Sequence, residues 1–314
     1  MIPDPFVLVI GGAAVDIQGF PDQNFRLYES NPGTIHSSLG GVGRNIADNL
    51  SRLGIETKFI TAIGDDLYGK KILQAAATTN LDMSDSLICS CLSTSTYLSL
   101  LNEHGEMIAA ISDMKLIDQL TVEYLKQKDA IIKSSSYLIL DTNLSLPVID
   151  YLTTHYQNIP IIIDPVSAKK AHKIKHIIGR FHTIKPNKQE AEVLTGIKIL
   201  DQNDLYLVEE QLLNSGIKQM FISLDAKGLF YSNGRQNGTL SPYQINVINA
   251  TGAGDASASA IAYGLMNQMP THQIATFSQA AAALVLSHED TINPAFTVGN
   301  IKKFLEEQHE ENTS

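Results

Sequence analysis

The stretch Asn249-Ala250-Thr251-Gly252-Ala253-Gly254-Asp255-Ala256, followed by small residues as far as Met266, is the most informative part of the sequence. Its two glycines let the chain turn tightly and place the backbone N–H groups of Gly252, Ala253 and Gly254 at the start of a helix. The N-terminal end of a helix carries partial positive charge and favours an anion. In the first helical turn, the carboxylate of Asp255 can accept the proton of a hydroxyl group that receives a phosphoryl group. We therefore predict a phosphate-binding turn at Thr251–Gly254 and a catalytic base at Asp255. The simpler alternative is a helix cap preceded by a loop.

A second motif, Lys185-Pro186-Asn187-Lys188-Gln189-Glu190, follows the strand-like pair Thr183-Ile184. Pro186 ends the strand, and Asn187 and Glu190 have the spacing of a capping box at the start of a helix. The same two side chains could instead present oxygens to hydrated Mg²⁺, which keeps several waters and needs only one or two protein groups. The residues alone leave both interpretations open.

A third motif, Ser38-Leu39-Gly40-Gly41-Val42-Gly43-Arg44-Asn45, opens a helix that Gly54 ends. Its glycines let a ligand approach the backbone, and Asn45 offers a donor and an acceptor to a polyol. Asp16, which follows the first predicted strand, could hold two neighbouring hydroxyl groups or be an exposed turn residue. The stretch from Gly64 to Gly69 is typical of a turn followed by a helix.

Apolar runs alternate with helical stretches along most of the chain. Near-continuous apolar strands separated by helices indicate a parallel sheet covered on both faces. We therefore predict one α/β domain over residues 1–314, with a mostly parallel sheet covered on both faces, and ligands beyond the carboxyl ends of its strands. The predicted strands are Val7–Ile10, Tyr137–Leu140, Ile161–Ile163 and Phe221–Leu224, and the last three end near Asp141, Asp164 and Asp225. At least one of these aspartates should only cap a turn.

Two segments, 14–38 and 94–112, depart from this pattern because they contain short stretches of alternating polar and apolar residues. Within the second, Asn102-Glu103-His104-Gly105 is typical of a turn between two strands. These segments predict a small β-sheet lid attached to the main domain.

Composition excludes several other classes of protein. The chain has 314 residues, of which 44% are hydrophobic and 18% charged, and a net charge of −10. It lacks the basic stripe that nucleic-acid binders use. Its apolar runs are too short to span a bilayer, and no basic and apolar leader opens it. Cys89 and Cys91 are too close together to define a disulfide framework. We expect a cytoplasmic protein that binds neither nucleic acid nor membrane.

Together the three motifs resemble the ribokinase-like (PfkB) family of carbohydrate and nucleoside kinases, in order and over nearly the whole chain. The resemblance implies ATP and Mg²⁺ as cofactors, a doubly wound α/β domain, and a β lid that often forms the interface of a homodimer. It assigns the base to Asp255, the anion hole to Gly252–Gly254, and the contact with Mg²⁺, through water, to Asn187 and Glu190. It assigns the binding of the sugar hydroxyls to Asp16, Gly41 and Asn45. It assigns the binding of the nucleotide to Asn187, Ser223, Gly228 and Thr251.

Within that family, several stretches resemble the pseudouridine kinases: Asn31–Ile35, Gly41–Ala47, Ala110–Met114 and Asp164–Ser167. This resemblance implies transfer of the γ-phosphate of ATP to the 5′-hydroxyl of pseudouridine. Thr96, Asp113 and Met114 lie in or beside the predicted lid and could close over the base, although Met114 could equally serve only to pack the lid.

Two positions depart from the family pattern. Many members carry Asp six residues before the base, where it helps to bind K⁺, whereas this chain has Asn249. Asp225 stands where glycine is more usual in the nucleotide loop. The alternatives to a pseudouridine kinase are a kinase for ribose, another nucleoside or another sugar, and a binding regulator without chemistry. Retention of Asp255 and of the whole anion turn argues against the regulator.

Overall fold

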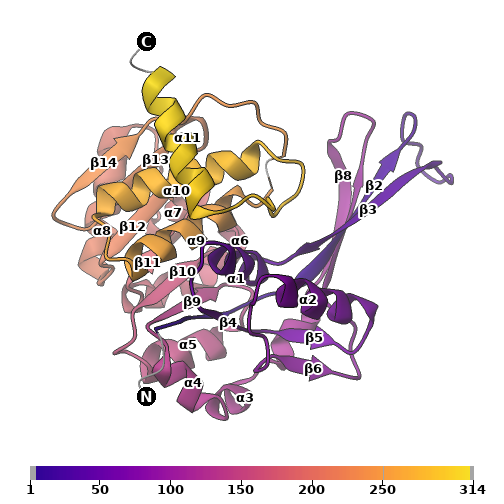
Figure 1. The fold of residues 1–314 in the computed structure, drawn as a ribbon, viewed down its shortest axis with the longest axis horizontal. Helices are drawn as coiled ribbons and strands as arrows, with labels where there is room; N and C mark the ends of the chain where they lie inside the picture. The colour runs from indigo at the N-terminus through magenta and orange to yellow at the C-terminus, as the bar shows by residue number, and fades with distance from the viewer. Residues whose placement is uncertain (1–4, 250, 312–314) are drawn as a thin grey trace.

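The computed structural model describes residues 5–249 and 251–311, and its centre is a sheet of eight strands (Figure 1). The spatial order is β14-β13-β12-β11-β10-β9-β1-β4. Neighbours from β12 to β4 run parallel, while β13 and β14 are antiparallel additions at one edge. The strands are β1 (Val7–Ile10), β4 (Thr57–Ile60), β9 (Tyr137–Asp141), β10 (Ile161–Asp164), β11 (Thr183–Ile184), β12 (Gln219–Ser223), β13 (Leu229–Ser232) and β14 (Asn237–Leu240).

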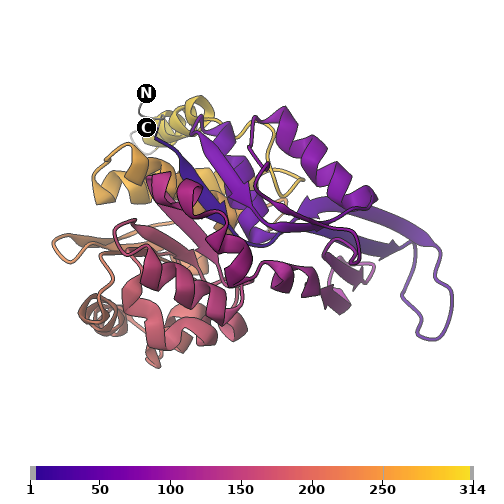
Figure 2. The same cartoon turned by 90° about the horizontal axis from the view of Figure 1, so that it is seen from below.

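Helices cover both faces of this sheet because the strands are apolar on both sides (Figure 2). Alternate side chains of β1 show the division: Leu8 and Ile10 enter one core, and Val7 and Val9 enter the other. The first core is shared with α3 (Val122–Lys126), α4 (Asp129–Ser134), α5 (Leu146–His155), α6 (Ala168–Ala171), α7 (Lys188–Thr195), α8 (Gln202–Ser215) and the 3₁₀ helices η1 (Lys115–Gln119) and η2 (His172–Arg180). The second is shared with α1 (Val42–Arg52), α2 (Leu67–Thr78), α9 (Ala253–Met266) and α10 (Thr271–Leu286), and α11 (Val298–Glu311) packs on α10. The predicted doubly wound α/β fold is confirmed.

A smaller sheet projects from the side of this body (Figure 1). Its order is β3-β2-β7-β8, and its strands come from both of the segments that the sequence sets apart. They are β2 (Ala14–Pro21), β3 (Gly33–Gly40), β7 (Thr96–Leu101) and β8 (Met107–Asp113). The predicted turn at Asn102–Gly105 joins β7 to β8, with Gly105 at φ +79°.

The small sheet is tied to the body where the chain enters β7. Asp66 caps α2 by accepting a hydrogen bond from Gly69 N (2.8 Å), and its carboxylate also accepts from Thr94 N (2.8 Å) and Thr94 Oγ1 (2.7 Å). Thr94 Oγ1 in turn accepts from Gly64 N (3.0 Å). The Gly64–Gly69 stretch is thus a turn and a helix start, as predicted, and it fixes Thr94, two residues before β7 begins. Beside it, β5 (Ala62–Gly64) pairs with β6 (Leu87–Cys89).

Over the described residues, no helix combines the length and the apolar character needed to cross a bilayer.

Candidate active site

The predicted anion turn lies at the start of α9, beyond the carboxyl ends of the parallel strands. Gly252 is the N-cap of α9 and has φ +86°, a left-handed conformation that favours glycine. A Cβ atom on Gly252 would lie 2.3 Å from the carbonyl oxygen of Thr291, and one on Gly254 would lie 3.3 Å from Nζ of Lys185. The two glycines therefore let the turn pack between a backbone carbonyl and a lysine ammonium group.

Asp255 occupies the first turn of α9, as predicted, and is half-buried. Its carboxylate accepts a hydrogen bond of 2.7 Å from Nδ2 of Asn45, which lies on α1 at the opposite end of the sequence. Burial and the negative charge of Asp164 raise the pKa of Asp255 to about 7, although the Asn45 hydrogen bond and Lys185 act in the other direction. A carboxyl group with a pKa near neutrality can both accept and release a proton in this pH range.

Lys185 belongs to this site, although sequence reasoning did not single it out. Its backbone N–H extends the sheet beyond β11, and its Nζ lies 3.4 Å from Oδ2 of Asp164 at the end of β10. Burial alone would lower the pKa of Lys185, but the carboxylates of Asp164, Glu190 and Asp255 outweigh it and leave the pKa raised. The ammonium group is therefore charged beside the anion turn. Its position directly after a strand, at the start of a motif with other predicted site residues, could have indicated it.

Asp16 and Asn45 lie near a second buried cation, Arg44, for which the sequence alone suggested no role, and Gly41 is the N-cap of the helix that carries it. The Arg44 guanidinium donates to Asp48 Oδ2 (3.2 Å) and to the Asn45 side chain. Burial raises the pKa of Asp16, and the nearby positive charge of Arg44 opposes that shift. A Cβ on Gly40 would lie 2.2 Å from the Asp16 carboxylate, and Gly41 has φ +92°. Asp16 and the start of α1 therefore share one polar region with Asp255.

Asp141, at the carboxyl end of β9, joins the first strand to the first helix. Its Oδ2 accepts hydrogen bonds of 2.8 Å from both Gly12 N and Gly43 N, and burial raises the pKa of the Asp141 carboxyl group. A Cβ on Gly11 would lie 2.5 Å from Asp141 Oδ2, so the carboxylate fills the space that the absent side chain leaves. Asp141 thus supports the start of α1. In contrast, Asp225 is an exposed residue of η3 (Asp225–Lys227) and lies in a turn.

The predicted Mg²⁺ motif forms a capping box at the start of α7. Asn187 Oδ1 accepts from Glu190 N (2.8 Å), and the Glu190 carboxylate accepts from Asn187 N (2.8 Å) and Nδ2 (3.0 Å). Glu190 is buried, and both burial and the charge of Asp164 raise its pKa, against the opposing effect of Lys185. The capping interpretation is therefore confirmed, and the same carboxylate adjoins the Asp164–Lys185 pair.

The predicted nucleotide residues lie next to this motif. Ser223 N donates to the carbonyl oxygen of Pro186 (3.0 Å), and Ser223 forms a parallel bridge with Asn187. The chain then turns through Asp225, at φ +51°, to Gly228. A Cβ on Gly228 would lie 1.9 Å from the carbonyl oxygen of Leu240, so this turn packs closely on the end of β14.

The predicted substrate residues of the lid lie on β7 and β8 and directly after β8. Thr96 and Asp113 are directly paired across β7 and β8, whereas Asp16 is paired with Tyr97 across β2 and β7. Because paired residues share a face and successive residues alternate, Thr96 and Asp113 lie on the opposite face of the small sheet from Asp16. Met114 follows β8 and is half-buried at the start of η1.

Comparisons with known proteins identify the family and the fold of the chain. A family model described as pfkB family carbohydrate kinase matches residues 4–297. The pseudouridine kinase of Escherichia coli (strain K12) is 35% identical over 302 residues, which cover 96% of each chain. An E. coli sugar kinase, YeiI, is 32% identical over 94% of this chain and 82% of its own length.

Among solved structures, Arabidopsis thaliana ribokinase complexed with ribose and ATP superposes with a TM-score of 0.81 at 19% identity. The match covers 96% of this chain and 98% of the ribokinase. The ribokinase-like fold is thereby established, and kinases of this type use ATP and Mg²⁺ to phosphorylate an alcohol group. The chain belongs to the pfkB family of carbohydrate kinases.

Proposed function

We propose that this kinase transfers the γ-phosphate of ATP to the 5′-hydroxyl of pseudouridine, giving pseudouridine 5′-phosphate and ADP. The proposed reaction rests on one observation: the Asp255 carboxylate, 2.7 Å from Asn45 Nδ2, lies in the first turn of α9 directly after the glycine turn. The proposed substrate is supported by the 35% identity to the E. coli pseudouridine kinase.

In this proposal, Asp255 is the catalytic base. It takes the proton of the 5′-hydroxyl while that oxygen bonds to the γ-phosphorus, and the bond from the γ-phosphorus to the bridging oxygen of ADP breaks. The Asn45 amide orients the carboxylate through its hydrogen bond. A base with a pKa of about 7 is half-ionised at neutral pH, which suits it for this transfer.

We assign the binding of the transferred phosphoryl group to the backbone N–H groups of Gly252, Ala253 and Gly254, assisted by Lys185. Its Nζ would lie 3.3 Å from a Cβ on Gly254, which is close enough to neutralise charge at the turn. Thr251, Ser223 and Gly228, with Asn187, would line the rest of the ATP site. Preorganised donors and charges of this kind usually make the largest contribution to phosphoryl transfer.

Asn187 and Glu190 are the residues that we expect to hold Mg²⁺, through water. Within the described parts of the chain, no three His, Cys, Asp or Glu side chains converge as a metal-binding group. Mg²⁺ commonly keeps several waters and takes its remaining ligands from phosphates, so a buried carboxylate beside Asp164 suits a water-mediated contact. When bound, Mg²⁺ would neutralise phosphate charge as the reaction proceeds.

On the acceptor side, Asp16, Gly41 and Asn45 would hold the ribose hydroxyls. Asn45 bonds both Arg44 and Asp255, and Asp16 packs against Gly40, the residue before Gly41. We propose that residues 1–314 act as one domain, with the small sheet as its lid. Thr96, Asp113 and Met114 remain our candidates for contact with the base. Thr96 and Asp113 lie on the face of the small sheet away from Asp16, so closure of the lid alone would not turn their side chains toward the ribose that Asp16 would hold.

We also propose that the lid forms a homodimer interface. Ile35, Leu98, Leu100 and Ile111 are exposed, and strand pairing places all four on one face of the small sheet. Ile111 is 68% exposed and Ile35 77%. A contiguous apolar face of this kind marks an interaction surface, and a second copy of the same face would cover it.

The alternative is a kinase for ribose, another nucleoside or another sugar, which the 32% identity to the E. coli sugar kinase supports. ADP release separates the two when it is measured with pseudouridine, uridine or ribose, with Asp255→Asn as the blank. Turnover that requires Asp255 and is fastest on pseudouridine supports the proposal. Turnover on ribose or uridine, with no turnover on pseudouridine, would show that the proposed substrate is wrong and would leave the proposed catalytic residues in place.

A further inference from the structure

The anion turn rests on a loop that no proposed role has used so far. This loop, residues 287–297, joins α10 to α11, and the segment before the turn bonds to the last residue of α10. Ile248 N and Asn249 N both donate to the Leu286 carbonyl oxygen, at 2.8 and 3.3 Å. At the turn itself, Gly252 packs so closely on the Thr291 carbonyl oxygen that a Cβ would lie 2.3 Å from it. Carbonyl oxygens of the end of α10 and of the loop therefore face the turn and the segment before it.

The side chain of Asn249 links the two segments. Its Nδ2 donates to the Glu289 carbonyl oxygen at 2.7 Å, and its Oδ1 accepts from Thr251 N at 2.8 Å. The orientation of the amide follows from these partners, because the flipped amide would set oxygen against oxygen and N–H against N–H. One neutral side chain thus bonds both the first residue of the turn and the loop beneath it.

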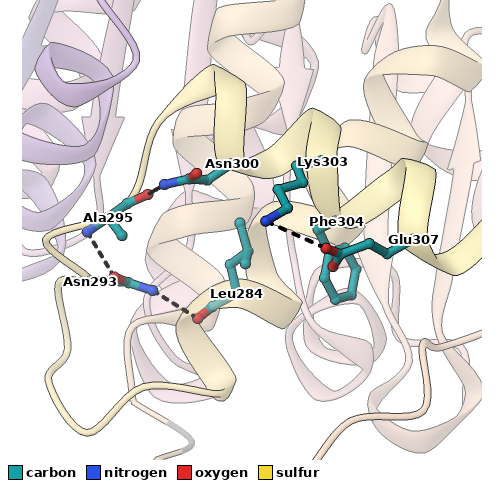
Figure 3. A pocket seen from close by; sticks show the side chains of 7 residues that line it. All are labelled: Leu284, Asn293, Ala295, Asn300, Lys303, Phe304 and Glu307. Atoms are coloured by element: carbon teal, nitrogen blue, oxygen red, sulfur yellow. Dashed lines mark hydrogen bonds and ion pairs between the residues drawn. The ribbon is translucent and has the colours of Figure 1, made fainter.

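The loop is itself held in place on its far side, in the pocket of Figure 3. Asn293 Nδ2 donates to the Leu284 carbonyl oxygen (3.1 Å), and its Oδ1 accepts from Ala295 N (2.8 Å). Asn300 Nδ2, from α11, donates to the Ala295 carbonyl oxygen (2.7 Å). These bonds fix the second half of the loop to α10 and α11. Next to Glu289, His288 N donates to the Val285 carbonyl oxygen (3.0 Å) and holds the first half against α10.

A monovalent cation does not fit the Asn249 side chain in this arrangement. The resemblance to the family places K⁺ beside an Asp at this position, where a carboxylate and carbonyl oxygens need a positive charge between them. Here an N–H group already opposes the Glu289 carbonyl oxygen, an amide nitrogen is not a ligand for a cation, and the amide oxygen accepts from Thr251 N. The hydrogen bond from Asn249 Nδ2 to the Glu289 carbonyl oxygen thus holds the two segments together, as a bridging cation would between a carboxylate and the same carbonyl oxygen.

We propose that Asn249 is a positioning residue whose amide holds the anion turn against the Glu289 carbonyl oxygen, so that nucleotide binding and phosphoryl transfer by this chain require no monovalent cation. The inference rests on the proposed function only in taking the turn as the phosphate site. The identity of the acceptor does not enter it.

The test compares KCl, NaCl and choline chloride at equal ionic strength. For the wild type, KM for ATP should stay within about twofold across the three salts, because the amide replaces the ion. Asn249→Asp sets a carboxylate against the Glu289 carbonyl oxygen, so we expect its KM for ATP to rise about tenfold or more in choline and to recover in K⁺. Asn249→Ala should weaken ATP binding in all three salts without recovery.

Asn267→Asp is the matched control, because the Asn267 amide also donates to a backbone carbonyl oxygen, that of Tyr263 (2.8 Å), at the far end of α9. It should leave the salt response unchanged. The rise in melting temperature caused by ADP with Mg²⁺, measured in the same salts, gives a readout that needs no acceptor and so separates this inference from the choice of substrate. The proposal would be overturned if KM for ATP of the wild type were about tenfold or more lower in K⁺ than in choline. It would also be overturned if KM for ATP of Asn249→Asp were the same in K⁺ as in choline.

Discussion

Replacing Asp255 by Asn should raise the stability of the protein at alkaline pH while it removes the activity. Burial raises the pKa of this carboxyl group from 3.8 to about 7. A shift of roughly three pKa units corresponds to about 4 kcal/mol, at about 1.4 kcal/mol per unit. Part of Asp255 remains in contact with water, so we expect a smaller effect, of about 2 kcal/mol.

The sign follows from where the proton is bound. Between pH 3.8 and 7 the folded protein keeps the Asp255 proton that the unfolded chain releases, so the stability present below pH 3.8 is lost as the pH rises to about 7. The amide that replaces the carboxyl group stays neutral at every pH, and its oxygen can still accept from Asn45 Nδ2. The gain in stability of Asp255→Asn over the wild type should therefore be small at about pH 4.5 and reach its maximum at about pH 8.

Guanidinium unfolding at these two pH values measures the difference, with Asp22→Asn, on an exposed residue of the loop after β2, as the control for a surface aspartate. The control should show the same small effect at both pH values. If Asp255→Asn changes the free energy of unfolding equally at the two pH values, the carboxyl group does not have a raised pKa, and the proposed base loses its physical support.

Other predictions concern the same site and the lid. The value of kcat/KM should fall about tenfold per pH unit below about pH 7, because protonated Asp255 cannot act as a base; a profile that is flat down to about pH 5 would contradict this. Glu190→Gln keeps the cap of α7 but removes the negative charge, so half-maximal activity should need more Mg²⁺. An unchanged dependence of activity on Mg²⁺ concentration would leave Glu190 with only its capping role. Lys185→Met should lower kcat about a hundredfold, measured at saturating ATP, and a normal kcat would remove it from the mechanism. Ile111→Asp should shift the protein towards monomer in analytical ultracentrifugation, while Leu200→Asp, at 75% exposure on the main body, should not; equal behaviour would exclude the lid interface.

Local sequence patterns predicted the elements of this fold well, because each depended on neighbours in the chain. The apolar stretch Val7–Ile10 is a buried strand, the Asn187–Glu190 spacing is a capping box, and Gly252 has the positive φ that a tight turn before a helix requires. The fold class followed from the alternation of such strands with helices.

The relations that define the site could not be obtained in this way. Asn45 and Asp255 are separated by 210 positions, and their hydrogen bond depends on how α1 and α9 pack. Lys185 gains its role from Asp164 on the neighbouring strand, a pairing that strand order decides. The face of the small sheet on which Thr96 lies depends on a register between β2 and β7 that neither strand reveals alone.

The most direct test of the account is a competition between substrates. The enzyme is given ATP, Mg²⁺ and an equimolar mixture of pseudouridine, uridine and ribose, and the early products are separated and identified by mass spectrometry and phosphorus NMR. The account predicts that pseudouridine 5′-phosphate forms first and in excess, and that Asp255→Asn forms none of the three products. Preferential phosphorylation of ribose or uridine, or a product profile that Asp255→Asn leaves unchanged, would contradict it.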